Sequence, residues 1–80
     1  MTHTPHELAD EFPDLRQRIH DLKTTDERFA HLAERYHALN REIHRIDAGI
    51  EGASDEHAET LKKQRLQLKD RIAGMLRAPA

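Results

Sequence analysis

Apolar residues recur at alternating steps of three and four through the middle of the chain. The first series is Phe29, Leu32, Tyr36, Leu39, Ile43, Ile46 and Ile50. A helix with this spacing carries one narrow apolar strip, which is normally buried against another helix. A second series at helical spacing contains Ala58, Leu61, Leu68, Ile72 and Met75. These two series, which we call the apolar seam, predict two long helices packed against each other.

Signals for helix ends set the limits of these two elements. Gly49 and Gly52 lie between the two series, and glycine commonly follows the end of a helix. Ser54 is a suitable N-cap for the second helix. We therefore expect helices over residues 26–48 and 55–77, each roughly 35 Å long. Equal lengths and a short connection predict an all-α fold, an antiparallel helical hairpin (coiled coil).

A shorter helical segment, over residues 5–23, precedes the hairpin. Its expected start is Thr4–Glu7, which has the spacing of a capping box. Pro13 interrupts the apolar pattern, so we expect a kink or a restart of the helix there. A second capping box, Thr24–Glu27, is expected to begin the first long helix. The whole chain, residues 1–80, is expected to form one domain.

The composition excludes several classes of protein. The 80 residues are 36% hydrophobic and 35% charged, and they include three aromatic side chains, no Trp and no Cys. So little apolar mass supports a seam between helices but not an enclosed active-site pocket, so we expect no enzyme activity. The absence of cysteine removes disulfides and thiolate zinc sites. The chain has no apolar run of about 18 residues and no pattern typical of a secretory signal, so we expect a cytoplasmic protein with no membrane span.

Charge is distributed unevenly along the chain. Residues 1–60 hold 7 Lys and Arg against 14 Asp and Glu, a balance of −7, whereas residues 61–80 hold 6 against 1, a balance of +5. We interpret the basic segment mainly as an electrostatic complement to acidic parts of the same fold or assembly. The alternative is an anionic partner such as RNA, although basic residues without interleaved aromatics are a weak signal for nucleic-acid binding.

Two apolar residues and one arginine do not fit a simple hairpin. Arg65 occupies a seam position, where its aliphatic part can cover apolar surface while its head reaches a polar partner. Leu66 and Ala73 lie off the seam and need cover from the segment 5–23 or from another chain. Because an isolated two-helix hairpin leaves its seam partly exposed, we expect a homo-oligomer, with a dimer favoured.

Histidine is abundant, with seven residues in the chain. His37 and His44 are seven residues apart, or about 10.5 Å along a helix, which is too far for one metal ion to bridge. We therefore expect no bound metal and no cofactor, with a metal or haem site built across chains as a remaining alternative. Several basic side chains on the long helices form the candidate partner surface: His37, Arg41, His44, Arg45, Lys62, Lys63 and Lys69.

The chain from Phe12 to Leu76 resembles the small bacterial YdcH family, also known as DUF465. The residues that carry the resemblance are Phe12-Pro13, Ile19-His20-Asp21-Leu22-Lys23, Arg28-Phe29, Leu39-Asn40-Arg41-Glu42-Ile43 and Leu61-Lys62-Lys63-Gln64-Arg65-Leu66-Gln67-Leu68-Lys69-Asp70. The last block is the most specific. The small coiled-coil family SlyX has the same general character but lacks the Lys-Lys-Gln block. The resemblance implies a helical hairpin in a cytosolic bacterial protein, and it implies no catalytic residues.

These observations together predict a small, non-enzymatic helical interaction module. We expect the protein to self-associate and to dock on a protein partner that the sequence does not identify. Two alternatives remain open. One is a small RNA-associated regulator that uses the basic C-terminal helix, and the other is a histidine-based metal or haem binder.

Overall fold

The computed structural model describes residues 6–78, and within them every regular element is a helix. The elements in chain order are α1 (Leu8–Glu11), the short 3₁₀ helix η1 (Pro13–Leu15), α2 (Arg16–Thr25), α3 (Glu27–Asp47) and α4 (Asp55–Arg77). The predicted all-α class is confirmed. No helix in this described part combines the length and the apolarity that crossing a membrane requires.

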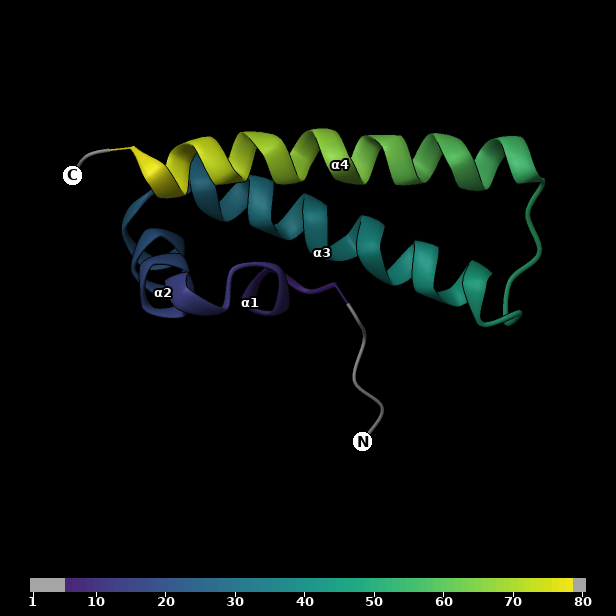
Figure 1. Ribbon diagram of the computed structural model, residues 1–80, viewed down its shortest axis with the longest axis horizontal. Coiled ribbons are helices and arrows are strands. Elements are labelled where there is room, and N and C mark those ends of the chain that lie inside the picture. Colours follow the sequence, from purple (N-terminus) through teal and green to yellow (C-terminus); the bar gives the residue numbers. More distant parts are fainter. Residues whose placement is uncertain (1–5, 79–80) are drawn as a thin grey trace.

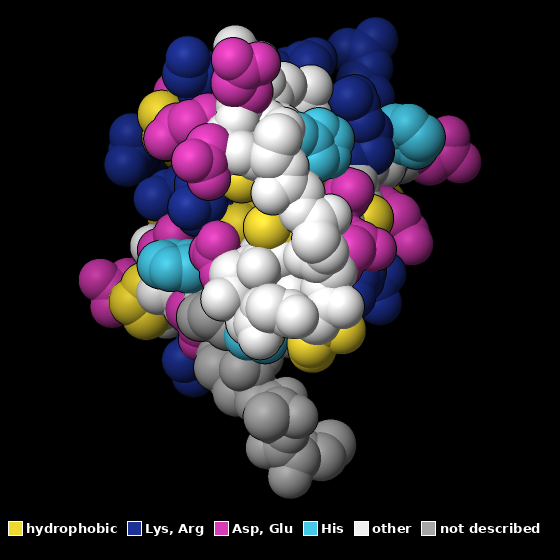
Figure 2. Space-filling model, turned by 90° about the vertical axis from the view of Figure 1, so that its right-hand side faces the viewer, with side chains coloured by type: hydrophobic (Ala, Val, Ile, Leu, Met, Phe, Trp, Pro, Cys, Tyr) yellow, Lys and Arg dark blue, Asp and Glu magenta, His cyan; other side chains and the backbone are white. Residues whose placement is uncertain are grey.

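The two long helices lie side by side and run in opposite directions (Figure 1). The loop between them is at one end of the molecule, and Gly49 occupies the left-handed region there with φ +77°. Figure 2 looks onto this loop end and shows Asp and Glu side chains gathered over the start of α4. The segment from α1 to α2 folds back against α3 near the opposite end.

Side-chain caps begin both long helices. The Asp26 carboxylate accepts hydrogen bonds from the backbone N–H groups of Arg28 (2.9 Å) and Phe29 (3.3 Å). The Ser54 hydroxyl accepts one from the His57 N–H at 3.1 Å, as the sequence predicts. The predicted cap at Thr24 is wrong, because α2 continues to Thr25 and the Thr24 hydroxyl donates back to the carbonyl of Asp21 instead.

The N-terminal segment departs further from the prediction. The expected capping box at Thr4–Glu7 is wrong, since α1 begins at Leu8 with Glu7 itself in the N-cap position. The Glu7 carboxylate makes no cap hydrogen bond and contacts α3 instead, while Thr4 lies outside the described residues. The chain does break at Pro13, where α1 has ended and η1 begins.

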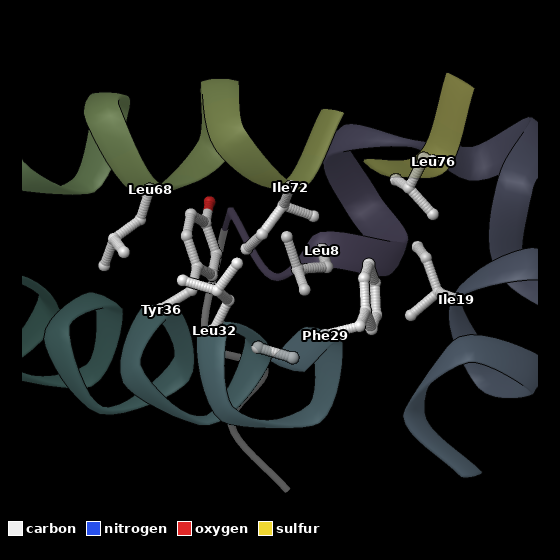
Figure 3. Close-up of a cluster of buried hydrophobic side chains, with 9 residues drawn as sticks. Leu8, Ile19, Phe29, Leu32, Tyr36, Leu68, Ile72 and Leu76 are labelled. Carbon is white, nitrogen blue, oxygen red and sulfur yellow. The ribbon is translucent and has the colours of Figure 1, made fainter. Parts of the chain in front are cut away.

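Side chains from α1, α2, α3 and α4 build one hydrophobic core (Figure 3). Its buried members are Leu8, Ile19, Phe29, Leu32, Ala33, Tyr36, Leu68, Ile72 and Leu76. Phe29, Tyr36 and Ile72 are fully buried at 0% exposure. The N-terminal segment therefore covers one side of the α3–α4 pair, a side that a two-helix hairpin would leave exposed.

The structure corrects part of the predicted seam. Ile50 is 74% exposed, because α3 ends at Asp47 and the chain turns away at Gly49. Ile43 and Leu61 are buried as well, although they lie outside the main core cluster. The half-buried apolar seam positions are Leu39, Ile46, Ala58 and Met75. Leu76, which the seam did not include, is buried in the core.

Arg18 joins α2 to the last turn of α4. Its Nε donates to the backbone carbonyl of Leu76 at 3.3 Å, and its Nη2 donates to that of Ala78 at 2.9 Å. The last carbonyls of a helix have no partner within the helix, so this guanidinium satisfies two acceptors that would otherwise face water. Arg18 therefore links α2 to the C-terminal end of α4.

Candidate interaction groove between α3 and α4

A cluster of four polar side chains connects the N-terminal segment to both long helices. The Arg65 guanidinium donates to the Asn40 Oδ1 at 3.0 Å, and the Asn40 Nδ2 donates to the Glu7 Oε1 at 3.4 Å. The other Glu7 oxygen lies 2.7 Å from the His37 Nδ1. Asn40 is 1% exposed, so its polar atoms depend on these partners rather than on water. We call Glu7, His37, Asn40 and Arg65 the polar cluster.

The polar cluster explains the irregular arginine of the seam. Arg65 points its charged group at a buried amide of α3, which lets a charged residue occupy a seam position. The sequence did not indicate that Asn40 is buried or that Glu7 reaches α3. Neither feature has a local signal, because both depend on where the N-terminal segment packs.

Tyr36 adds a second tie between α3 and the N-terminal segment. Its hydroxyl donates to the backbone carbonyl of His6 at 2.6 Å. Burial raises the pKa of this phenol from 10.0 to about 12, with a smaller contribution from the nearby negative charge of Glu11.

We expect this buried phenol to make the protein less stable at high pH. The unfolded chain loses the Tyr36 proton near pH 10 while the folded chain keeps it to about pH 12. The stabilisation is therefore complete below pH 10 and is lost as the pH rises through 12. Tyr36 is the one Tyr in the chain and there is no Trp, so ultraviolet absorbance of the phenolate reports this group alone. A midpoint near 10 in the folded protein would contradict the prediction.

Three members of the candidate partner surface predicted from the sequence have acidic partners within the chain. His37 bonds to Glu7, the Lys69 Nζ lies 3.5 Å from a Glu11 oxygen, and the Lys62 Nζ lies 3.6 Å from an Asp47 oxygen. His37 and Lys69 therefore contact the N-terminal segment, whereas Lys62 pairs near the loop between α3 and α4. The remaining members are Arg41, Arg45 and Lys63, which are exposed, and His44, which is half-buried.

A large open groove lies between α3 and α4. It consists of two adjoining parts, of about 940 Å³ and about 440 Å³, that share Arg35 and Arg71 in their walls. Apolar side chains line it from both helices, and they are Leu32, Leu39, Leu68 and Met75. The N-terminal segment packs elsewhere on α3, so it leaves this groove open.

Charged side chains line the same groove. The cationic side chains are Arg28 and Arg35 from α3 and Arg71 from α4, and the imidazole of His31 lies among them in the groove wall. Each part of the groove also has one acidic side chain, Glu27 in the larger part and Glu42 in the smaller part. Among residues 6–78, the guanidinium groups of Arg28, Arg35 and Arg71 make no ion pair or side-chain hydrogen bond. The groove thus combines apolar walls with arginines that are available to an anionic ligand.

The sequence pattern did not predict this groove, and none of the seven predicted surface residues lines it. A signal was present, because Arg28, His31 and Arg35 follow one another at steps of three and four beside the seam. The absence of a bound metal, which the sequence leads us to expect, stays a prediction. No group of three or more His, Asp and Glu side chains in the described range is arranged to hold a metal ion.

Gly74 forms part of the groove wall on α4. A Cβ built on Gly74 would have no neighbour within 4 Å, so no packing inside the chain requires a glycine there. Glycine within a helix is less favourable than alanine by about 0.5–1 kcal/mol. Gly74 therefore weakens α4 slightly and leaves the α4 side of the groove without a side chain at this position.

We expect Gly74→Ala to raise the free energy of unfolding by about 0.5–1 kcal/mol. The reason is the higher helix propensity of alanine and the empty space around this position. Urea denaturation followed by circular dichroism measures the change. Destabilisation by Gly74→Ala would show instead that the position is more crowded than the structure has it.

Comparison with known proteins places the chain in a family. The family described as "Protein of unknown function (DUF465)" matches residues 29–76, which span most of α3 and most of α4. Uncharacterized protein YdcH of Escherichia coli (strain K12) is 34% identical over 65 residues, covering 81% of this chain and 88% of YdcH, and YdcH of Shigella flexneri matches equally. No solved structure matches. The resemblance seen in the sequence is thereby confirmed, and the chain belongs to the DUF465 family.

Proposed function

We propose that this protein is a small, non-enzymatic interaction module that docks an acidic amphipathic helix of a partner protein in the groove between α3 and α4. The observation that carries the proposal is the combination, in one groove, of apolar walls and three arginines that have no side-chain partner among residues 6–78. Apolar contact would supply most of the binding free energy, and the arginines would select the charge and the orientation of the partner.

The shape of the groove favours a helix as the ligand. The α3 residues that line it run from Glu27 to Glu42, which corresponds to roughly 22 Å, or about four turns of a docked helix. Two antiparallel helices present a groove that the apolar face of a third helix fills in a bundle. The low wall at Gly74 allows a large side chain of the ligand to approach α4 closely.

The charges favour an acidic ligand. Arg28 and Arg35 are seven residues apart, so their side chains leave α3 on the same face about two turns apart. A partner helix with carboxylates seven residues apart can meet both of them. Arg71, on the opposite wall, faces a third carboxylate on the other flank of the same partner helix.

A second copy of this chain is a poor occupant of the groove. Arg35 and Arg71 line both parts of the groove, so they lie at its centre. A two-fold axis through that centre would bring four guanidinium groups together, and like charges in contact disfavour association. The groove is therefore better suited to a different protein.

A photo-crosslinking residue placed at Gln67, which lines the groove, tests the proposal in Escherichia coli cells. We expect a crosslink to a partner, mapped by mass spectrometry to an acidic amphipathic helix. The crosslink should disappear with Gly74→Leu, which fills the groove, and with Arg35→Glu combined with Arg71→Glu. The matched control is the same photo-crosslinker at Asp21, an exposed position on α2 outside the groove.

The other outcomes each count against the proposal. A product of twice the chain mass would assign the groove to a second copy, and a crosslink to RNA would favour the nucleic-acid alternative. A partner that reacts equally from Asp21, or that survives Gly74→Leu, does not use the groove. The absence of any product specific to Gln67 would also overturn the proposal.

A further inference from the structure

A second surface, on the outer side of α4, carries charged side chains in a regular sequence along the helix. Figure 1 shows α4 along one edge of the molecule with no element on its outer side. One row along this side steps by three and four residues: Asp55, Glu59, Lys62, Leu66, Asp70, Ala73 and Arg77. All are exposed except Ala73, which is half-buried. We call this row the outer face of α4.

The outer face has an exposed leucine at its centre. Leu66 is 56% exposed, and it and Ile50 are the large hydrophobic side chains exposed within residues 6–78. Ile50 lies in the loop, whereas Leu66 lies in the middle of a regular 23-residue helix. A single exposed leucine is ordinary on a protein surface. The arrangement of charges around this one is what indicates a partner.

If a second copy of the row is turned end to end about Leu66 and laid against the first, charged residues of opposite sign face each other. Lys62 lies four residues before Leu66 and Asp70 lies four residues after it, so the two exchange places. Asp55 and Arg77, eleven residues away on either side, exchange places in the same way. In both cases, a negative charge meets a positive one.

We propose that two copies of this chain associate through the outer face of α4, antiparallel, with Leu66 at the two-fold axis. Each Lys62 then faces the Asp70 of the other copy, and each Asp55 faces the other Arg77. By symmetry every pair occurs twice, as in any isologous interface. The two leucines meet at the axis, and Ala73 faces the aliphatic part of Glu59 of the other copy.

A parallel arrangement does not share this complementarity. With the two-fold axis along the helices, each residue meets its own copy, so Lys62 would face Lys62 and Asp70 would face Asp70. Like charges in contact destabilise such a pair. The charge order therefore selects the antiparallel orientation.

The contacts within the chain leave this face available. Lys62 pairs with Asp47 at 3.6 Å, but both side chains are about half exposed, and such pairs hold a lysine only weakly. The groove proposed to dock a partner helix is on another flank of α4, where Gln67, Arg71 and Gly74 lie. A dimer through the outer face would leave both grooves open, so this inference does not depend on the function proposed above.

Charge reversal tests the proposed pairing. We expect sedimentation equilibrium, up to about 1 mM chain, to show a weak monomer–dimer equilibrium at low salt. Lys62→Glu should weaken the dimer about tenfold, since it places like charges opposite Asp70 twice. Lys62→Glu combined with Asp70→Lys should restore it, because the two charges are exchanged. The matched control is Lys63→Glu, the same charge change at the next residue, which should not weaken the dimer.

Crosslinking tests the position of the axis. The chain has no cysteine, so Leu66→Cys introduces one thiol that would meet its own copy at the axis and form an intermolecular disulfide on oxidation. Gln67→Cys, on the groove side, should form that disulfide much more slowly. A monomer at every concentration, equal weakening by Lys63→Glu, no recovery in the double exchange, or equal oxidation of the two cysteine variants would each overturn the proposal.

Discussion

Phe29→Ala should lower the free energy of unfolding by about 3–5 kcal/mol, the cost of removing a large buried aromatic side chain. The Phe29 ring is fully buried, and Figure 3 shows it between Leu8 of α1 and Ile19 of α2, below Leu76 of α4. A domain of this size has a total stability of only about 4–12 kcal/mol. The variant should therefore be largely destabilised, as measured by urea denaturation with circular dichroism.

Ile50→Ala provides the matched control for this prediction. The sequence pattern places Ile50 and Phe29 at opposite ends of the same apolar series, whereas the structure leaves Ile50 74% exposed. Its replacement should therefore change the stability by no more than about 0.5 kcal/mol. Equal losses in the two variants would show that α3 continues through residue 50 and that the original seam is right.

Asn40→Leu should lower the free energy of unfolding by about 1–3 kcal/mol, although it makes the interior more apolar. Asn40 is buried, and its amide accepts a hydrogen bond from Arg65 and donates one to Glu7. Leucine has a similar volume but leaves those two charged groups without this partner. The loss arises from the unsatisfied groups and not from a cavity.

A second variant separates these two causes. Replacing Arg65 as well, in Asn40→Leu with Arg65→Met, removes the guanidinium that the first change leaves without its amide partner. Exchange of both members of a buried polar pair for apolar groups is often close to neutral. We therefore expect the double variant to recover part of the lost stability. If the double variant loses as much stability as the two single replacements added together, the hydrogen bond between Asn40 and Arg65 does not contribute as the structure indicates.

The long helices could be predicted from the sequence because their signals are local. Residues 55–77 are the expected limits of α4 and also the observed ones, since the Ser54 cap and the helical period act within a few residues. Thr24 and Asp26 are both suitable caps for α3. The choice between them depends on how far α2 extends, which the packing of α2 against α3 decides.

The groove and the polar cluster could not be predicted in the same way. Arg35 and Arg71 come together only because α3 and α4 are paired in one particular register. Glu7 has the sequence context of a capping residue, yet its carboxylate contacts His37 and Asn40, about 30 residues further along the chain. Contacts of this kind follow from tertiary packing, which overrides the local preference of a residue.

The way the N-terminal segment is attached determines the order in which parts of the molecule form and separate. Helix α2 packs on α3, which follows it directly in the chain, but the hydrogen bonds that fasten the segment elsewhere span from 30 residues, between His6 and Tyr36, to 60 residues, between Arg18 and Ala78. Helices α3 and α4, by contrast, are joined by a short loop. Closing a long loop costs more entropy than closing a short one, so the α3–α4 pair should form first during folding. In the native state the N-terminal segment should detach first, and amide hydrogens of α2 should exchange faster than those in the middle of α3.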